Sequence, residues 1–135
     1  MKKILFIFSI FCFTHCVSQK SQNFMEISYG SICCGTPSTE PVMNYINQFQ
    51  KKNKIKTFEI YQQTGLGREG EFNLYIGTDH LSKNQKTSFV KGLETAISSQ
   101  NNARLKNRDG MVSFNATTVN KADLDKAKNV TIYKK

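Results

Sequence analysis

Two adjacent cysteines are the residues of this sequence whose types and spacing are best suited to chemistry. Cys33 and Cys34 stand within the segment GSICCG. Adjacent thiols in an oxidising compartment have three chemical fates: a disulfide with each other, a soft-metal site, or separate disulfides to other cysteines. The remaining alternative is that one cysteine packs as a small apolar side chain while the other is exposed or paired with it.

His80 is the side chain that would complete a thiol site. It follows Asp79 and comes just before a predicted helix. A redox, metal or nucleophilic site would require His80 to meet Cys33 or Cys34 in space. We expect the loops after the first and third predicted strands to lie at the same end of the sheet, which would allow this meeting. The competing interpretation is a lone surface histidine.

The segment GLGREG, residues 65–70, matches the GxGxxG pattern of dinucleotide-binding loops. Such a site needs a helix directly after the glycines, so that the pyrophosphate meets unpaired N–H groups, whereas here a strand is predicted to follow. The segment therefore predicts a hairpin whose glycines supply positive φ. Glu69 and Glu71 have the acid–base chemistry of paired carboxylates, but we interpret them as charges at the hairpin tip and expect no catalytic residue there.

Hydrophobic periodicity indicates which elements must position these residues. Alternation of apolar and polar residues predicts strands, and apolar residues at helical spacing predict helices. The predicted strands are 24–29, 55–62, 72–76, 111–114 and 130–133, and the predicted helices are 42–52, 82–97 and 121–128. The clearest start is Ser82, because Gln85 three residues later completes a capping box. The polar run SSQNN, residues 98–102, is expected to end that helix.

The order β-α-β-β-α-β predicts an α+β fold of the ferredoxin-like, split β-α-β kind, an antiparallel sheet with two helices on one face. The last helix and strand would be additions to this arrangement. Each long predicted helix has one apolar stripe, as expected if it covers a sheet from one side. The fold hosts many unrelated functions and therefore does not indicate one.

The position of the two cysteines resembles that in heavy-metal-associated domains, which carry two cysteines in the strand-to-helix loop of the same fold. Those domains have Cys-x-x-Cys after a Gly-Met-Thr stretch, whereas Cys33 and Cys34 are adjacent and follow Gly-Ser-Ile. The resemblance implies a soft-metal site in this loop, although adjacent cysteines would give a single metal ion an awkward geometry.

The first eighteen residues have the three-part layout of a secretory signal. Two lysines follow Met1, the run ILFIFSIFCF (4–13) is apolar apart from one serine, and THCVS (14–18) is small or polar. A ten-residue apolar helix spans only about 15 Å, half of a hydrocarbon core of about 30 Å, so a permanent membrane span is not expected.

The same segment resembles a bacterial lipoprotein signal, in which a cysteine directly after the apolar region becomes the lipid-carrying first residue. Cys16 stands in that place, although His15 occupies the position where the pattern has a small residue. The resemblance implies lipidation of Cys16 and a membrane anchor, and the alternative is ordinary cleavage after Ser18. We expect residues 19–23 to be a polar tether and residues 24–135 to form a single α+β domain.

Basic charge narrows the choice of partner. Two of the 19 Lys and Arg residues belong to the leader, so residues 19–135 carry a net charge of +7 with their 10 acidic residues. This excess suits an anionic envelope surface or an acidic partner. The alternative is a solvated face, because Lys51 and Lys52 close a predicted helix, where cations complement the dipole. Nucleic acid is not an expected partner, since no basic stripe is interleaved with exposed aromatics.

Together these features favour a small exported, envelope-associated binding module without catalytic activity or cofactor. Its expected partner is an envelope protein or an anionic surface component. The alternative is a thiol-redox or soft-metal-handling protein that uses Cys33, Cys34 and His80. We expect the protein in the cell envelope or periplasm, held by a lipid if Cys16 is acylated, and outside the cell if the chain is cut after Ser18.

Overall fold

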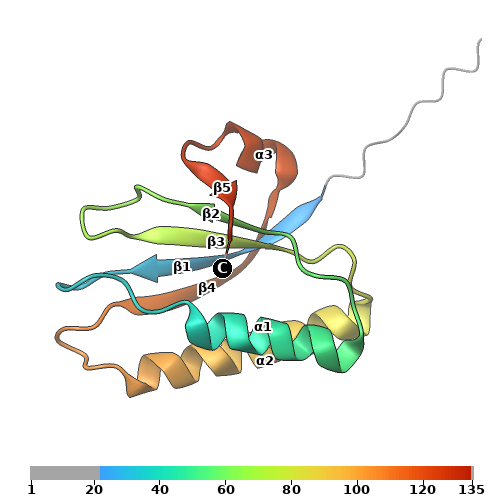
Figure 1. The fold of residues 1–135 in the computed structure, drawn as a ribbon, viewed down its shortest axis with the longest axis horizontal. Coiled ribbons are helices and arrows are strands. Elements are labelled where there is room, and N and C mark those ends of the chain that lie inside the picture. Colours follow the sequence, from blue (N-terminus) through green and yellow to red (C-terminus); the bar gives the residue numbers. More distant parts are fainter. Residues whose placement is uncertain (1–21, 135) are drawn as a thin grey trace, which may run out of the picture.

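The computed structural model describes residues 22–134, so the leader and Cys16 lie outside the described residues. Eight elements follow one another along the chain (Figure 1). They are β1 (Asn23–Gly30), α1 (Glu40–Asn53), β2 (Ile60–Gln63), β3 (Phe72–Gly77), α2 (Lys83–Ala103), β4 (Met111–Asn120), α3 (Lys121–Lys126) and β5 (Val130–Ile132). The predicted α+β class is confirmed.

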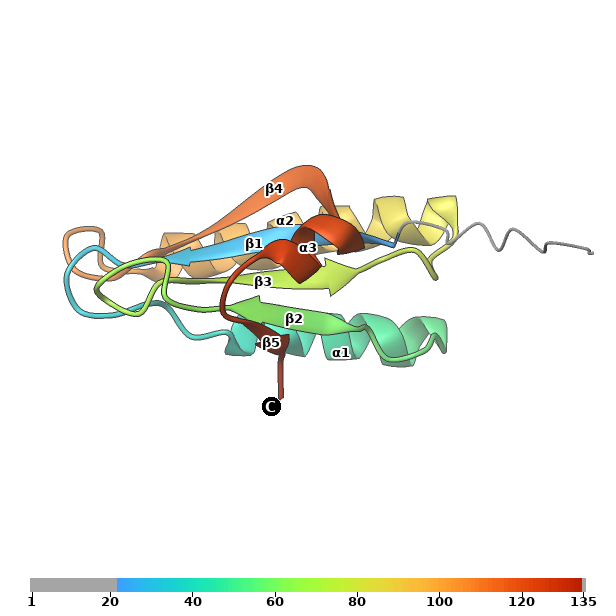
Figure 2. The ribbon, with the colours of Figure 1, turned by 90° about the horizontal axis from the view of Figure 1, so that it is seen from above.

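The five strands form one sheet in the order β4-β1-β3-β2-β5, and every neighbouring pair is antiparallel. The register sets Ile27 at the centre of β1 opposite Leu74 of β3 and Phe114 of β4. Figures 1 and 2 show α1 and α2 side by side on one face of the sheet, while α3 lies on the opposite face. Helices pack on both faces of the sheet because successive side chains of β1 point to opposite faces.

The side chains of β1 alternate between a large core and a small one. Met25, Ile27 and Tyr29 point to the helices and join the large core, in which Phe89 and Leu93 of α2 are fully buried. On the other face, a second cluster covered by α3 consists of Phe24, Tyr75 and Leu124, none of them more than 5% exposed. The sheet therefore buries apolar side chains on both faces.

The start of α2 is confirmed and its predicted end is wrong. Ser82 accepts a hydrogen bond from the backbone N–H of Gln85, and the Gln85 side chain accepts one from the backbone N–H of Ser82, which completes the capping box. The helix then continues through the polar run 98–102 to Ala103. Contacts with distant segments hold this last turn, because the side chains of Gln100 and Asn101 bond to the backbone of Ser38 and Val112.

Two strands differ in length from the expectation. The second was expected over 55–62, but β2 begins at Ile60, because Ile60 pairs with Ile76 and the neighbouring strand β3 ends one residue later at Gly77. The Gly77 N–H still donates to the carbonyl oxygen of Glu59, and the chain before Glu59 has no strand beside it. The fourth was expected to end at Phe114, but β4 runs to Asn120 beside the whole of β1, with a register shift opposite Met25 and Glu26.

Candidate functional site

Cys33 and Cys34 form a disulfide with each other. Both are exposed and lie in the loop 31–39 between β1 and α1. Of the fates open to adjacent thiols, the structure therefore has the disulfide between neighbours. Among residues 22–134, no group of three or more His, Cys, Asp or Glu side chains is arranged to hold a metal ion.

His80 lies at the opposite end of the sheet from the disulfide, so the expectation that the two loops share an end is wrong. The strands β1 and β3 are antiparallel, with Tyr29 opposite Phe72 and Phe24 opposite Gly77. The loop after Gly30 thus leaves one end and the loop after Gly77 leaves the other. The length of β1 separates them by roughly 20 Å. Cys33, Cys34 and His80 therefore form no common site.

His80 is an exposed histidine that packs against one aromatic ring. Its imidazole lies 4.9 Å from the ring of Phe58, edge to face. Partial burial lowers the pKa of His80 below its ordinary value; Asp79 opposes this effect and the cation of Lys56 adds to it. The imidazole is thus held toward its neutral form.

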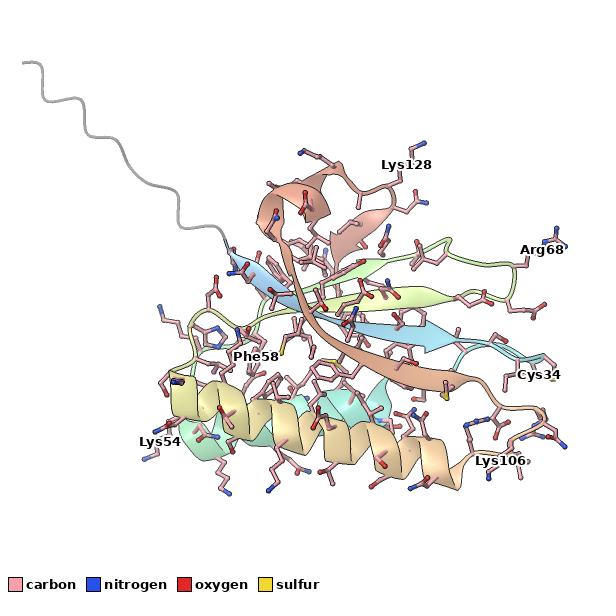
Figure 3. The ribbon with its side chains drawn as sticks, turned by 180° about the vertical axis from the view of Figure 1, so that it is seen from behind. Cys34, Lys54, Phe58, Arg68, Lys106 and Lys128 are labelled. Atoms are coloured by element: carbon pink, nitrogen blue, oxygen red, sulfur yellow. A yellow bond between two sulfur atoms is a disulfide. The ribbon has the colours of Figure 1, made fainter. Side chains whose placement is uncertain are left out.

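Three loops meet at the end of the sheet that carries the disulfide, and we call them the loop end: residues 31–39, 64–71 and 104–110. The register brings them together, because Gly30 is paired with Met111 and Tyr29 with Phe72. Figure 3 shows Cys34, Arg68 and Lys106 on the three loops at this end, away from Phe58.

Loop 104–110 is held by its own hydrogen bonds. The guanidinium of Arg104 donates to the carbonyl oxygens of Lys106 and Asp109, both at 3.2 Å. The Asp109 carboxylate accepts from the backbone N–H of Leu105 at 2.8 Å and from Nε of Arg108 at 2.9 Å. These bonds, the first of them above all, lower the pKa of the Asp109 carboxyl. The loop therefore holds a defined conformation while Lys106 and Arg108 stay exposed.

Loop 31–39 packs directly on the segment before β4. A Cβ at Gly110 would overlap the carbonyl oxygen of Gly30 and crowd Cδ of Pro37, so only glycine fits there. The side chain of Gln100 also donates to the carbonyl oxygen of Ser38 at 2.7 Å. A shallow cleft of about 290 Å³ remains between these segments, with Arg104 in its wall.

The hairpin 64–71 has the predicted turn chemistry. Gly65 and Gly70 have φ of 75° and 83°, which favours glycine and confirms the hairpin interpretation of GLGREG. The Glu71 carboxylate accepts a hydrogen bond from the backbone N–H of Glu69 at 2.9 Å. Glu71 thus stabilises the hairpin tip, as expected of a charged turn rather than of a catalytic pair.

Exposed apolar side chains gather at the loop end. In residues 22–134 five large hydrophobic side chains are exposed, and four of them belong to the three loops or to the first residue of β4. The four and their exposed fractions are Ile32 (52%), Leu66 (46%), Leu105 (59%) and Met111 (45%). Sequence reasoning did not single them out. The signal was present in Leu66 and Leu105, each a lone apolar residue among glycines or charges.

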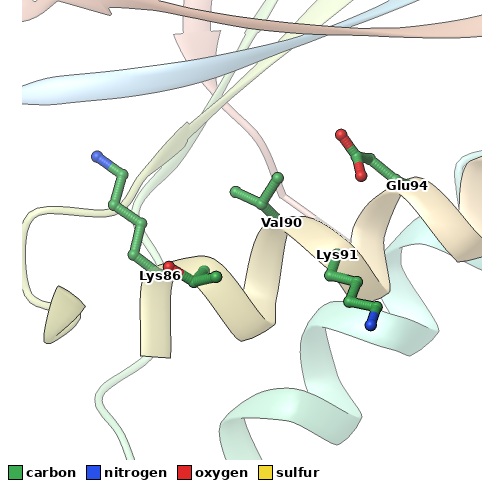
Figure 4. A pocket seen from close by; sticks show the side chains of 5 residues that line it. Lys86, Val90, Lys91 and Glu94 are labelled. Atoms are coloured by element: carbon green, nitrogen blue, oxygen red, sulfur yellow. The ribbon is translucent and has the colours of Figure 1, made fainter. Parts of the chain in front are cut away.

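A second cleft, of about 380 Å³, lies along α2 and is distant from the disulfide. It is lined by side chains of α2 alone, and Figure 4 shows Lys91 turned away from Val90 and Glu94. The lining side chains do not converge on a common point. This cleft is a groove along the helix surface, without the arrangement of an active site.

Comparison of the chain with protein-family models, curated proteins and solved structures gives no match. Within the described range 22–134, no helix combines the length and the apolar character needed to cross a bilayer.

Proposed function

We propose that this protein is an exported, envelope-associated binding module without catalytic activity, and that it binds its partner through the loop end. The observation that carries the proposal is the gathering there of four of the five exposed large hydrophobic side chains in residues 22–134. Exposed apolar side chains that gather at one end of a domain beside polar ones are typical of interaction surfaces. The disulfide between Cys33 and Cys34 adds an uncharged, exposed surface to the same patch.

The charges around the patch favour a partner with anionic groups. Lys106 and Arg108 are exposed on loop 104–110, where Asp109 is the acidic residue and already accepts two hydrogen bonds. On the side of loop 104–110, an apolar centre with cations at its rim suits an envelope protein that presents an apolar patch next to carboxylates or phosphates. The hairpin adds no net positive charge, because Glu69 and Glu71 stand beside Arg68. Nucleic acid is a poorer fit, because the exposed large hydrophobics of the loop end are aliphatic and do not stack on bases.

The proposal extends to the leader and to the type of fold. We propose that residues 1–18 direct export, that Cys16 carries a lipid, and that residues 19–23 connect it to the domain. We also propose that β1 to β4 with α1 and α2 form a ferredoxin-like unit. The strand order β4-β1-β3-β2 supports this, with β5 added outside β2.

Site-specific photo-crosslinking tests the binding surface in cells that express the full chain. A photoreactive residue at Met111 is expected to form a defined adduct, whereas the same residue at the exposed positions Gln48 and Thr95 on the helices forms none. The combined substitutions Ile32→Ser, Leu66→Ser and Leu105→Ser should reduce the Met111 adduct at least about tenfold, since each removes part of an apolar contact.

The triple variant should retain its circular-dichroism spectrum, because the three side chains are exposed. Equal adducts from the helix positions, or an adduct that survives the triple substitution, would refute binding through the loop end.

The exposed disulfide supports a second candidate function, thiol–disulfide exchange. An external dithiol would attack one sulfur, form a mixed disulfide and leave as a disulfide, so that Cys33 and Cys34 gain two electrons and two protons. The double variant Cys33→Ser with Cys34→Ser separates the candidates. If the protein is a binding module, the double variant keeps the fold and the Met111 adduct. If the protein acts in thiol–disulfide exchange, the double variant no longer transfers electrons to a small-molecule disulfide. If the reduced protein also takes up zinc or copper, the soft-metal alternative gains support.

A further inference from the structure

The end of the sheet opposite the loop end is rich in lysine. We call it the basic end, and it consists of the last turn of α1, the link to β2 and the first turn of α2. It carries six lysines: Lys51, Lys52, Lys54, Lys56, Lys83 and Lys86. Five of them are exposed and Lys86 is half-buried. The chain enters the sheet at the same end. The first residue of β1, Asn23, is paired with the last residue of β4, and the next residue of β1 is paired with the last residue of β3.

These lysines are not neutralised within the described chain. Residues 22–134 contain two salt bridges, Arg108–Asp109 and Lys121–Asp125, and neither involves the basic end. The two carboxylates in the links that lead to β2 and to α2, Glu59 and Asp79, have other partners. Asp79 accepts from the backbone N–H of Asn23 at 2.9 Å, and Glu59 accepts from the side chain of Gln22 at 2.7 Å and from the Tyr61 hydroxyl. Five exposed lysines and the half-buried Lys86 thus have two carboxylates among them, and both carboxylates are occupied by other partners.

Helix stability accounts for only part of this charge. Lys51 and Lys52 lie in the last turn of α1, where cations complement the helix dipole. Lys83 and Lys86 lie at the start of α2, where the dipole favours anions, and the first turn of α2 contains no acidic residue. Lys54 is the C-cap of α1 and shares that favourable position, whereas Lys56 lies beyond the helix. Three of the six lysines therefore stand where local helix energetics give no reason for a cation.

We propose that the basic end docks on the surface of an anionic lipid bilayer. The inference rests on the export and tethering of the proposed function, since a lipid on Cys16 would bring this end to the membrane. Residues 17–22 span at most about 20 Å when extended, so an anchored chain holds the basic end within reach of the headgroups. One acyl chain with a polybasic surface is a two-part anchor, stronger than either part alone.

The composition of the basic end favours a lipid surface over a protein partner. None of the five exposed large hydrophobics in residues 22–134 belongs to the three segments of the basic end, and protein interfaces are depleted in lysine and centred on apolar side chains. Headgroup phosphates require only dispersed cations that approach a plane. Docking by this end directs the loop end away from the bilayer, toward a partner.

Vesicle binding by residues 19–135 tests the proposal, because all eight elements lie within this range and no acyl chain contributes. The protein should co-sediment with vesicles of phosphatidylcholine and about one third phosphatidylglycerol, and not with phosphatidylcholine alone. Binding should weaken strongly between about 0.1 and 0.5 M salt. Each lysine at such a surface contributes roughly a fivefold factor, so Lys51→Gln, Lys52→Gln, Lys54→Gln and Lys56→Gln together should lower the partition coefficient at least about 100-fold.

The matched control removes the same charge elsewhere: Arg68→Gln, Lys106→Gln, Arg108→Gln and Lys128→Gln. Three of these positions are labelled in Figure 3, away from Lys54. The control should lose less than about tenfold. An equal loss in both variants, equal binding to both kinds of vesicle, or binding only to an acidic protein or to DNA would overturn the proposal. Failure here leaves the Met111 adduct unaffected, and failure of the adduct leaves vesicle binding unaffected, so the two proposals fail separately.

Discussion

Asn101 completes the outer edge of the sheet, and its removal should destabilise the protein measurably. Its amide donates to the carbonyl oxygen of Val112 at 2.7 Å and accepts from the Val112 N–H at 3.0 Å, as a neighbouring strand would. Each bond contributes about 1 kcal/mol net. We therefore expect Asn101→Ala to lower the free energy of unfolding by about 1–2 kcal/mol, with water replacing part of the loss.

Asn102 provides the control, because it is the same residue type on the same turn of α2 and its side chain is exposed. Both alanines gain the same helix propensity, so the difference between the two variants isolates the bonds to Val112. Urea denaturation at equilibrium measures it, and a fall in Tm of about 4 °C per kcal/mol should accompany it. If the two variants agree within about 0.3 kcal/mol, the bonds to Val112 do not stabilise the edge.

Asn101→Ala should also change the behaviour of the exposed edge of β4. Since the N–H and carbonyl of Val112 face Asn101, alternation along β4 directs those of Phe114 outward as well, before the register shift near Thr118. Asn101→Ala thus lengthens the unpaired edge of a strand that contains no charge and no proline. Faster hydrogen exchange at the Val112 amide and self-association at high concentration should follow, and neither should occur in Asn102→Ala.

Two further predictions concern the two ends of the sheet. Gly110→Ala should cost about 2–3 kcal/mol in urea denaturation, because its Cβ meets the backbone of Gly30. The control Gly67→Ala displaces the Glu71 carboxylate and loses its bond to Glu69, so it should cost about 1 kcal/mol, and equal costs in the two variants would contradict the close approach at Gly110. The NMR titration midpoint of His80 should lie below about 6.5 and rise in Lys56→Gln. Because the folded state then binds this proton less readily than the unfolded one, the contribution of His80 to stability is complete above about pH 6.5 and declines as pH falls below it; a midpoint at or above 6.5 would contradict this.

Local signals in the sequence predicted the parts of the fold that depend on neighbouring residues. The capping box of Ser82 and Gln85 and the glycine hairpin at 65–70 need only their own segment to form, and both are confirmed. The predicted end of α2 was wrong because the last turn of this helix depends on distant segments. Asn101 is a weak helix former on its own, and the bonds of Gln100 and Asn101 to Ser38 and Val112 depend on segments brought close by the sheet.

In the candidate site, too, the feature that depends on neighbouring residues was predicted and the features that depend on distant segments were not. The pairing of Cys33 with Cys34 was among the fates that their adjacency predicts, and the structure contains it. The meeting of His80 with the cysteines failed because it depended on the direction of β3 relative to β1, and the antiparallel register sends the two loops to opposite ends. The apolar surface of the loop end depends on three loops at once, so no single stretch of sequence reveals it.

The position of β1 between two neighbouring strands has a mechanical consequence. Its first residue, Asn23, receives the chain from the N-terminal side, and its last residue, Gly30, leads into the loop that carries the disulfide. A pull between these two points runs along the strand, which is hydrogen-bonded to β3 on one side and to β4 on the other. Such a load shears both ladders at once instead of peeling their bonds one after another. A domain tethered at one end and loaded at the other would therefore resist extension along the axis on which it is pulled.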